Sequence, residues 1–412
     1  MAAQFFSSLA DNALLVGAIA MLIDIASPQW MTPLLKLFFV ISYVLLAPFV
    51  GAFADSMPKG RVMFIANTIK VIGCALLLFD MHPLLAYAVV GLGAAAYSPA
   101  KYGILTEILP PEQLVAANGW IEGLTVISII LGTVMGGVLI TPVVSDALLA
   151  FDVPRIDTGI DTPGEAAVLV TGLFYVVAAA FNLYIPNTGV DHMVLHRNPV
   201  YLTRDFYHCF ALLWKDKLGQ ISLATTTLFW GAGATLQFIV LKWADVALGY
   251  PLSKASMLQG VSAVGIALGA VAAARLVPLR KSVSVLFCGA IMGIVTMSMV
   301  FVHDIQLAIP LMVAIGALAG FFVVPMNALL QHRGHVLMGA GSSIAVQNFN
   351  ENLSILLMLS VYALLIRADV PVYAIIVLFG LFISSSMVMV IRRPDANQLK
   401  GDSLHLIGMQ KH

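Results

Sequence analysis

The sequence predicts an all-α membrane protein with twelve transmembrane helices in two pseudo-symmetric halves of six. Its 412 residues are 60% hydrophobic and 10% charged, and the mean hydropathy is +0.96. Soluble domains carry about 25% charged residues, so this chain has too few of them to cover a water-exposed surface. Twelve stretches are long and apolar enough to cross a bilayer, and the longest polar gap separates the sixth from the seventh.

These stretches define the organisation of the chain. The predicted spans are 4–25, 33–54, 61–79, 83–106, 113–139, 165–185, 219–242, 255–276, 281–302, 305–330, 339–365 and 371–391. We expect an N-terminal half at 1–186, a cytoplasmic linker at 187–218, a C-terminal half at 219–393 and a cytoplasmic tail at 394–412.

The basic residues orient the chain. If both termini lie on one side, that side carries fourteen of the 21 Lys and Arg residues, the other side carries five, and Lys70 and Lys101 fall within spans. Cytoplasmic loops of membrane proteins are enriched in Lys and Arg, so both termini and the linker are predicted to be cytoplasmic. His332, Arg333 and His335 are expected in a solvated cytoplasmic turn after the tenth span.

Several function classes have no support. The formal net charge is zero, which does not favour a nucleic-acid partner. The chain has no GxxxxGK[ST] phosphate-binding loop and no HExxH zinc motif, and none of its nine histidines is followed five residues later by the aspartate of a membrane acyltransferase. We therefore predict no enzyme activity, no cofactor and no metal site.

The two halves show weak internal similarity, which indicates a duplication. Aligning the proline of "AYSPAKYGIL" with that of "FVVPMNALLQ" places Lys101 opposite Asn327. The segment "NGWIE" at 118–122 then corresponds to "QNFNE" at 347–351. Transporters built from two six-helix repeats bind their substrate near the bilayer midplane between the halves.

The loop "GAFADSMPKGR" between the second and third spans is similar to the signature loop of the major facilitator superfamily, so that fold is expected. Gly51 permits close helix approach, and Asp55 and Arg61 are predicted to pair at a cytoplasmic gate that opens and closes. The spacing from Asp55 to Gly60 and Arg61 is two residues longer than the usual pattern. A plain topology signal from basic residues is the alternative.

Five Asp, Glu, Lys or Arg residues lie at least five residues inside the ends of predicted spans. Such a side chain at the bilayer centre costs about 2.5–3.5 kcal/mol on insertion scales, so each requires a reason. Asp11, Glu122 and Glu351 are expected either to handle substrate or ions or to pair with neighbouring helices. Lys70 is predicted to pair with an acid such as Asp11 or Glu122, and Lys101 either snorkels to the interface or meets a negative group of the substrate.

Polar neighbours extend these candidate sites. Asn118 lies four residues before Glu122, and Gln347 lies four residues before Glu351, so each pair shares one helix face. Such faces are either substrate contacts or hydrogen-bond networks between helices. Gln237 lies in the seventh span, the repeat counterpart of the first, and is expected to line the cavity.

The fifth span carries spaced glycines at Gly123, Gly132, Gly136 and Gly137. The pattern resembles that of proton-coupled drug antiporters of the same superfamily, although Gly137 replaces a proline of that pattern. Small residues also let helices pack closely, which is the structural alternative. A proton-coupled drug or metabolite exporter therefore remains an alternative function.

Seven segments in order resemble the bacterial lysophospholipid transporter family, and together they span nearly the whole chain. They are "ADNALL" (10–15), "APFVGAFADSMPKGRVM" (47–63), "GAAAYSPAKYGIL" (93–105), "AANG" (116–119), "FWGAG" (229–233), "GFFVVPMNALLQHRG" (320–334) and "AVQNFNEN" (345–352). The resemblance implies a flippase-like carrier of the bacterial inner membrane. It would move lysophosphatidylethanolamine and lysophosphatidylglycerol from the outer to the inner leaflet by alternating access. A cytoplasmic acyltransferase–acyl carrier protein synthetase, expected here as a separate partner, would then restore the second chain.

One position departs from the family pattern. An arginine is expected where this chain has Gln237, so another cation must meet the lipid phosphate if that arginine does so in relatives. We expect Lys101 or Lys70 to take this role, and Glu122 or Glu351 to hold an ethanolamine ammonium. A non-transporting membrane scaffold for the acyltransferase is a further alternative.

Overall fold

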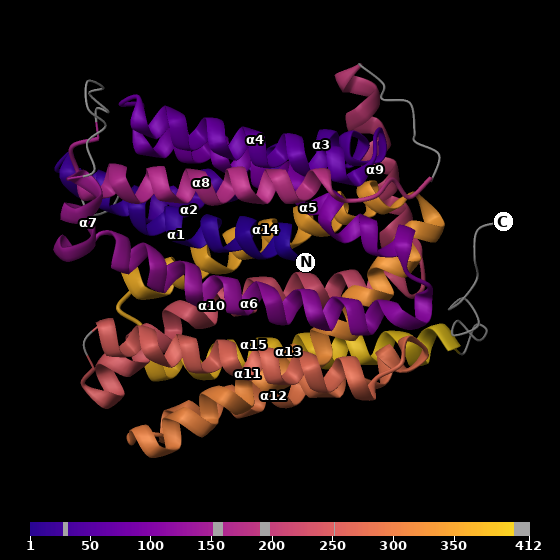
Figure 1. The fold of residues 1–412 in the computed structure, drawn as a ribbon. Coiled ribbons are helices and arrows are strands. Elements are labelled where there is room, and N and C mark those ends of the chain that lie inside the picture. Colours follow the sequence, from indigo (N-terminus) through magenta and orange to yellow (C-terminus); the bar gives the residue numbers. More distant parts are fainter. Residues whose placement is uncertain (28–31, 151–159, 190–197, 251, 399–412) are drawn as a thin grey trace. The chain divides into compact units, whose positions relative to one another are not determined.

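All elements of the described part of the chain are helices (Figure 1). The computed structural model describes residues 1–27, 32–150, 160–189, 198–250 and 252–398. The α-helices are α1 (Ala2–Asp24), α2 (Thr32–Leu45), α3 (Ala47–Asp55), α4 (Lys59–Leu78), α5 (Pro83–Ile108), α6 (Leu114–Leu139), α7 (Pro142–Leu149), α8 (Pro163–Leu183), α9 (Pro199–Lys215), α10 (Gly219–Leu248), α11 (Leu252–Leu276), α12 (Phe287–Met297), α13 (Ile305–Leu337), α14 (Ala340–Arg367) and α15 (Val372–Gln398). Short 3-10 helices are η2 (Pro111–Gln113), η3 (Leu279–Val285) and η4 (Ser298–Phe301).

The predicted spans are confirmed as helices. Within the described ranges, eleven helices are long and apolar enough to cross a membrane, and the number rises to twelve when the bent pair α2–α3 counts as one span. That pair bends by 63° where α3 begins. Pro48 lies in the first turn of α3, and because proline has no backbone N–H, it cannot continue the hydrogen bonds of α2.

Several helices lie outside or extend beyond the predicted spans. The expected linker 187–218 contains α9, and α13 continues to Leu337, seven residues past the predicted end of the tenth span. His332 and Arg333 therefore lie on a helix and are buried, so the expectation of a solvated turn is wrong. The last helix, α15, includes the first residues of the expected tail, whose remaining residues, 399–412, lie outside the described ranges.

The chain forms two compact units. Unit 1 comprises Met1–Glu107 and Ile127–Phe206, and unit 2 comprises Ile108–Val126 and Tyr207–His412. The chain thus passes from unit 2 to unit 1 within α6. Gly119, early in α6, lies against Ala270 and Ala274 of α11, and Gly132, later in α6, lies against Leu9 of α1. The boundaries of the two halves, 1–186 and 219–393, remain a prediction.

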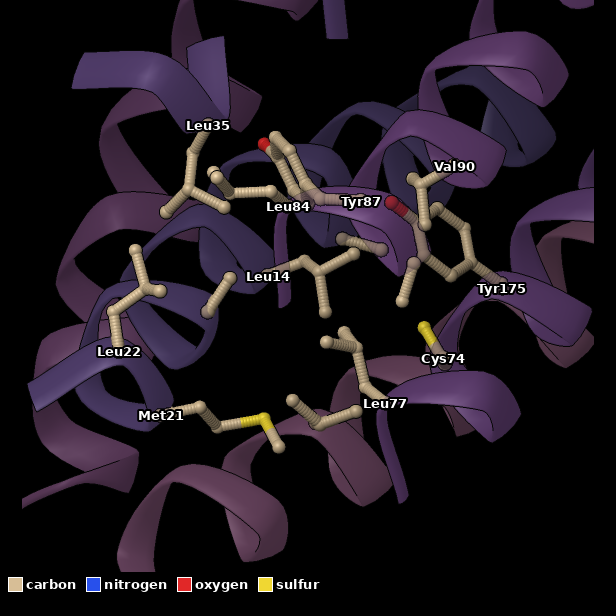
Figure 2. Close-up of a cluster of buried hydrophobic side chains, with 14 residues drawn as sticks. Leu14, Met21, Leu22, Leu35, Cys74, Leu77, Leu84, Tyr87, Val90 and Tyr175 are labelled. Atoms are coloured by element: carbon tan, nitrogen blue, oxygen red, sulfur yellow. The ribbon is translucent and has the colours of Figure 1, made fainter. Parts of the chain in front are cut away.

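The core of unit 1 lies between α1, α2, α4, α5 and α8. Figure 2 shows it as a cluster of leucines with Tyr175, Cys74 and Val90 at one end. Because lipid tails are as apolar as these side chains, the cluster stabilises the unit mainly through close van der Waals packing between its helices. Tyr175 is fully buried and belongs both to this core and to a polar cluster beside it.

Backbone contact between α11 and α13 organises unit 2. A Cβ at Gly265 or Gly269 of α11 would meet the backbone of α13, and a Cβ at Gly316 or Gly320 of α13 would meet the backbone of α11. Small residues at such positions let membrane helices approach until their backbones touch. This packing fixes α13, the helix that carries Asn327, Gln331 and Arg333.

Candidate functional site

Asp11 of α1 and Lys70 of α4 form an ion pair in unit 1. The Lys70 Nζ lies 2.7 Å from Asp11 Oδ1 and 3.0 Å from Oδ2. The Lys70 side chain is 1% exposed, whereas that of Asp11 is 27% exposed. The predicted pairing of Lys70 with an acid is confirmed, and the carboxylate is the member of the pair that another molecule can reach.

Neighbouring groups hold this pair in position. The Tyr175 hydroxyl donates to Asp11 Oδ1 at 2.7 Å, and the Lys70 ammonium donates to Ser7 Oγ at 3.1 Å. The Lys70 Nζ also lies 5.2 Å from the ring centroids of Tyr97 and Tyr175, within the range of cation–π attraction. Lys70 therefore has a full set of partners and acts to position Asp11.

This arrangement depends on the close packing of α5 against α4. A Cβ at Gly93 of α5 would lie 2.7 Å from the carbonyl oxygen of Ala66 and 2.8 Å from Lys70 Cγ. Only glycine allows this approach without displacing the lysine. The same approach brings Tyr97, four residues after Gly93, over the Lys70 ammonium.

Lys101 lies one turn beyond Tyr97 on α5, so the two residues share a helix face. Its side chain is half-buried, and its Nζ lies 3.3 Å from the Tyr102 hydroxyl and 4.4 Å from the centroid of that ring. In contrast to Lys70, this lysine is not fully buried. Lys101 is thus the better candidate of the two for meeting a phosphate.

A second polar cluster lies between α13 and α14 of unit 2. The Gln347 Nε2 donates to Asn327 Oδ1 at 3.0 Å and to Glu351 Oε1 at 2.7 Å, so the predicted shared face of Gln347 and Glu351 is confirmed. All three side chains are buried. The Gln347 Oε1 is buried and accepts no hydrogen bond, which leaves one acceptor for a donor from outside this cluster.

Asn118 joins α6 to α13 within unit 2. Its amide exchanges two hydrogen bonds with that of Gln331, at 2.9 and 2.8 Å, and it also donates to the Leu114 carbonyl at 2.9 Å. Asn118 is fully buried, so the structure gives it the role of linking two helices. The side chain of Glu122 lies outside the described residues.

Gln237 is exposed on α10 and contacts Gln259 of α11. The Gln237 Nε2 donates to Gln259 Oε1 at 3.0 Å, and the Gln259 Nε2 donates to the Gln237 carbonyl at 3.0 Å. The amide brings no charge to this position. A lipid phosphate would therefore have to find its cation elsewhere.

The predicted gate contains a different cation from the expected one. The Lys59 Nζ lies 2.7 Å from Asp55 Oδ1 and 3.4 Å from Glu107 Oε1, and it donates to the Ala54 carbonyl. Arg61, the predicted partner of Asp55, is exposed. The turn between α3 and α4 places Lys59 next to Asp55, and the four-residue spacing was the sequence signal for this pair. The gating role of Asp55 and Arg61 remains a prediction.

Sequence reasoning missed a second ion pair, between Asp216 and Arg333. The Arg333 Nη2 and Nε lie 2.6 and 3.1 Å from the two carboxylate oxygens of Asp216. The same carboxylate accepts from the backbone N–H groups of Leu218 and Gly219 at the start of α10. The bidentate pair therefore ties the end of α13 to the junction of α9 and α10.

Two of the four spaced glycines of α6 serve packing. A Cβ at Gly132 or Gly136 would meet the backbone of α1 at Leu9 or Ala13, the residues on either side of Asp11. Gly123 and Gly137 have open space around them. Among the described residues, no group of three His, Cys, Asp or Glu side chains could hold a metal ion.

Comparison with known proteins identifies the family. The model of the Major Facilitator Superfamily matches residues 1–358. The lysophospholipid transporter LplT of Yersinia enterocolitica is 42% identical over 375 residues, covering 91% of this chain and 88% of the relative. The same transporter of Yersinia pestis is 42% identical over 376 residues, with the same coverage of both chains.

Solved structures agree on the fold. A bacterial homologue of the iron transporter ferroportin has a TM-score of 0.69 at 14% identity, covering 95% of this chain and 98% of that one. The E. coli fucose:proton symporter FucP has a TM-score of 0.70 at 12% identity, covering 95% and 97%. At sequence identities this low, the similarity to these two structures shows the fold alone. The chain belongs to the Major Facilitator Superfamily and, within it, to the lysophospholipid transporter family.

Proposed function

We propose that this protein is a carrier that moves lysophospholipids from the outer to the inner leaflet of a bacterial inner membrane, and that it is not an enzyme. The observation that carries this proposal is the 42% identity to lysophospholipid transporters over 91% of the chain. A lysophospholipid has a charged head and a single acyl chain. Its transport requires a polar site for the head within an apolar protein.

The cluster in unit 1 suits a zwitterionic head. Asp11 is partly exposed and can hold an ethanolamine ammonium, since a charge-assisted hydrogen bond is stronger than a neutral one. Lys101 can meet the phosphate, because its side chain is half-buried rather than enclosed. We assign Lys70 the task of orienting Asp11.

The cluster in unit 2 offers acceptors of its own. The unpartnered Gln347 Oε1 can accept from the ammonium of the head, and the neighbouring Glu351 carboxylate supplies negative charge. The two clusters together provide polar groups in both units. Glu122, whose side chain is not described, remains a candidate on the strength of its sequence position.

Transport in this direction would deliver the lysolipid to the cytoplasmic face, where the second chain can be restored. We propose a separate cytoplasmic acyltransferase–acyl carrier protein synthetase as the partner that consumes the product. The excess of Lys and Arg on one side supports cytoplasmic termini.

Reconstitution in liposomes tests the proposal. The pure protein should move lysophosphatidylethanolamine between leaflets, and Lys101→Ala should slow this by about tenfold or more, the equivalent of one lost charge-assisted contact. Lys242→Ala is the matched control, because Lys242 is an exposed lysine paired with Asp245 at the surface. It should transport normally.

The same liposomes separate the alternatives. Absence of lysolipid movement by the wild-type protein would refute the proposal, and export of a soluble dye driven by a pH gradient would support a proton-coupled exporter instead. Normal transport in Asp11→Asn, Lys101→Ala and Glu351→Gln would overturn the site while leaving the function standing.

A further inference from the structure

A long apolar groove runs between α10, α14 and α15 of unit 2. Its volume is about 590 Å³, and eleven of the fifteen residues that line it are Leu, Ile, Val, Met or Phe. Its floor is closed where α10 touches α14, since Gly231 lies directly against the side chains of Ser354 and Met358. All three helices are long and apolar enough to cross a membrane, so the groove lies at the depth of hydrocarbon.

The groove is long enough for an extended hydrocarbon chain. It follows α14 from Asn350 to Leu365, which corresponds to about 22 Å at 1.5 Å per residue. An extended hydrocarbon chain can therefore lie along α14 in contact with the apolar wall over this whole length.

Three of the four polar side chains of the groove wall hydrogen-bond to the protein itself. The Thr235 hydroxyl donates to the Gly231 carbonyl at 2.9 Å, and the Tyr362 hydroxyl donates to the Phe238 carbonyl at 3.3 Å. The Asn350 Nδ2 donates to the Val346 carbonyl at 2.8 Å. With these groups satisfied, the wall offers contact mainly to apolar atoms, which an acyl chain provides.

One end of the groove adjoins the polar cluster of unit 2. Asn350, which lines that end, directly precedes Glu351 on α14, and Gln347 lies one turn earlier. The unpartnered Gln347 Oε1 and the Glu351 carboxylate thus lie within a turn of the point where the apolar wall begins. A polar end followed by a long apolar wall matches a molecule that has one charged head and one chain.

We infer that this groove binds the single acyl chain of the transported lysophospholipid when its head lies at the unit 2 cluster, Gln347 and Glu351, one of the two head sites proposed above. The inference rests on the proposed function and adds a reason for substrate choice. The groove therefore selects substrates by the length and apolar character of their chain, and the polar clusters select them by head.

Filling the groove tests this assignment. Leu357 and Val361 line it, are 60% and 56% exposed, and can each be replaced by Trp without disturbing the buried core. Leu364 is 63% exposed on the same helix but does not line the groove, so Leu364→Trp is the matched control. In liposomes, Leu357→Trp and Val361→Trp should slow transport of long-chain lysophosphatidylethanolamine by about tenfold, as expected when a chain loses about two methylene contacts. A short-chain analogue should be transported at the wild-type rate, and Leu364→Trp should leave both substrates unaffected.

A labelling experiment on the wild-type protein does not depend on the folding of any variant. Lysophosphatidylethanolamine with a photoreactive group at the end of its chain should label α14 and α15, and unlabelled lysolipid should compete whereas diacyl phosphatidylethanolamine should not. Equal competition by the diacyl lipid would identify a crevice for bulk membrane lipid and overturn the inference. Equal loss of long- and short-chain transport in the Trp variants would also overturn it. An inactive wild-type protein would instead refute the proposed function, whereas an active one with an unchanged chain-length profile in the variants would refute the groove alone.

Discussion

Removing either charge of the Asp11–Lys70 pair should have unequal effects on stability. In Asp11→Asn the Lys70 ammonium, 1% exposed, stays in the interior without a counter-charge, which costs about 3–5 kcal/mol for a buried pair. In Lys70→Met the Asp11 carboxylate is 27% exposed and keeps the hydrogen bond from Tyr175, so we expect a loss of about 1–2 kcal/mol.

The double variant Asp11→Asn/Lys70→Met completes a cycle that isolates the pair. It contains neither charge, so its stability should lie within about 1 kcal/mol of the wild type. Its transport should nevertheless be lost, because the carboxylate proposed to hold the ammonium is absent. Stability and function are thereby measured separately on the same protein.

The free energy of unfolding of the purified protein in detergent, measured for all four forms, checks this reasoning. A larger loss in Lys70→Met than in Asp11→Asn would refute the view that burial of the lysine decides the asymmetry. A double variant as unstable as the sum of the two single variants would show that the charges do not depend on one another.

Three further substitutions and one control substitution probe other contacts. Arg333→Lys should lower the free energy of unfolding by about 1–3 kcal/mol, because lysine cannot keep both hydrogen bonds to Asp216. A free energy of unfolding equal to that of the wild type would contradict the bidentate role of Arg333. Lys59→Met should cost about 3 kcal/mol, since it leaves two neighbouring carboxylates without their cation, and thermal unfolding should detect this. Gly93→Val should displace Lys70 and lower transport together with stability, whereas Gly123→Val, at a position with open space, should leave both near the wild-type values.

The spans and the polar residues within them could be predicted from the sequence, because a bilayer imposes a length of about 20 apolar residues and a penalty on each charge. Lys70 was expected to need an acid, and the structure supplies Asp11. The partner of Asp55 was predicted wrongly: Lys59, four residues on, pairs with it, and Arg61 is exposed. The Asp216–Arg333 pair joins residues 117 positions apart, and no local pattern marks such a contact.

By itself, the sequence determined the class of the protein, the number of its spans and its family, since these follow from composition, periodicity and motifs read along the chain. Only the tertiary structure decided which lysine is enclosed and which is accessible, because burial depends on the helices that surround a residue. It also decided that α6 passes from one unit to the other and that α10, α14 and α15 enclose a groove. Shape of this kind arises from side chains far apart in sequence, such as Leu228 and Phe382, and no window along the chain contains both.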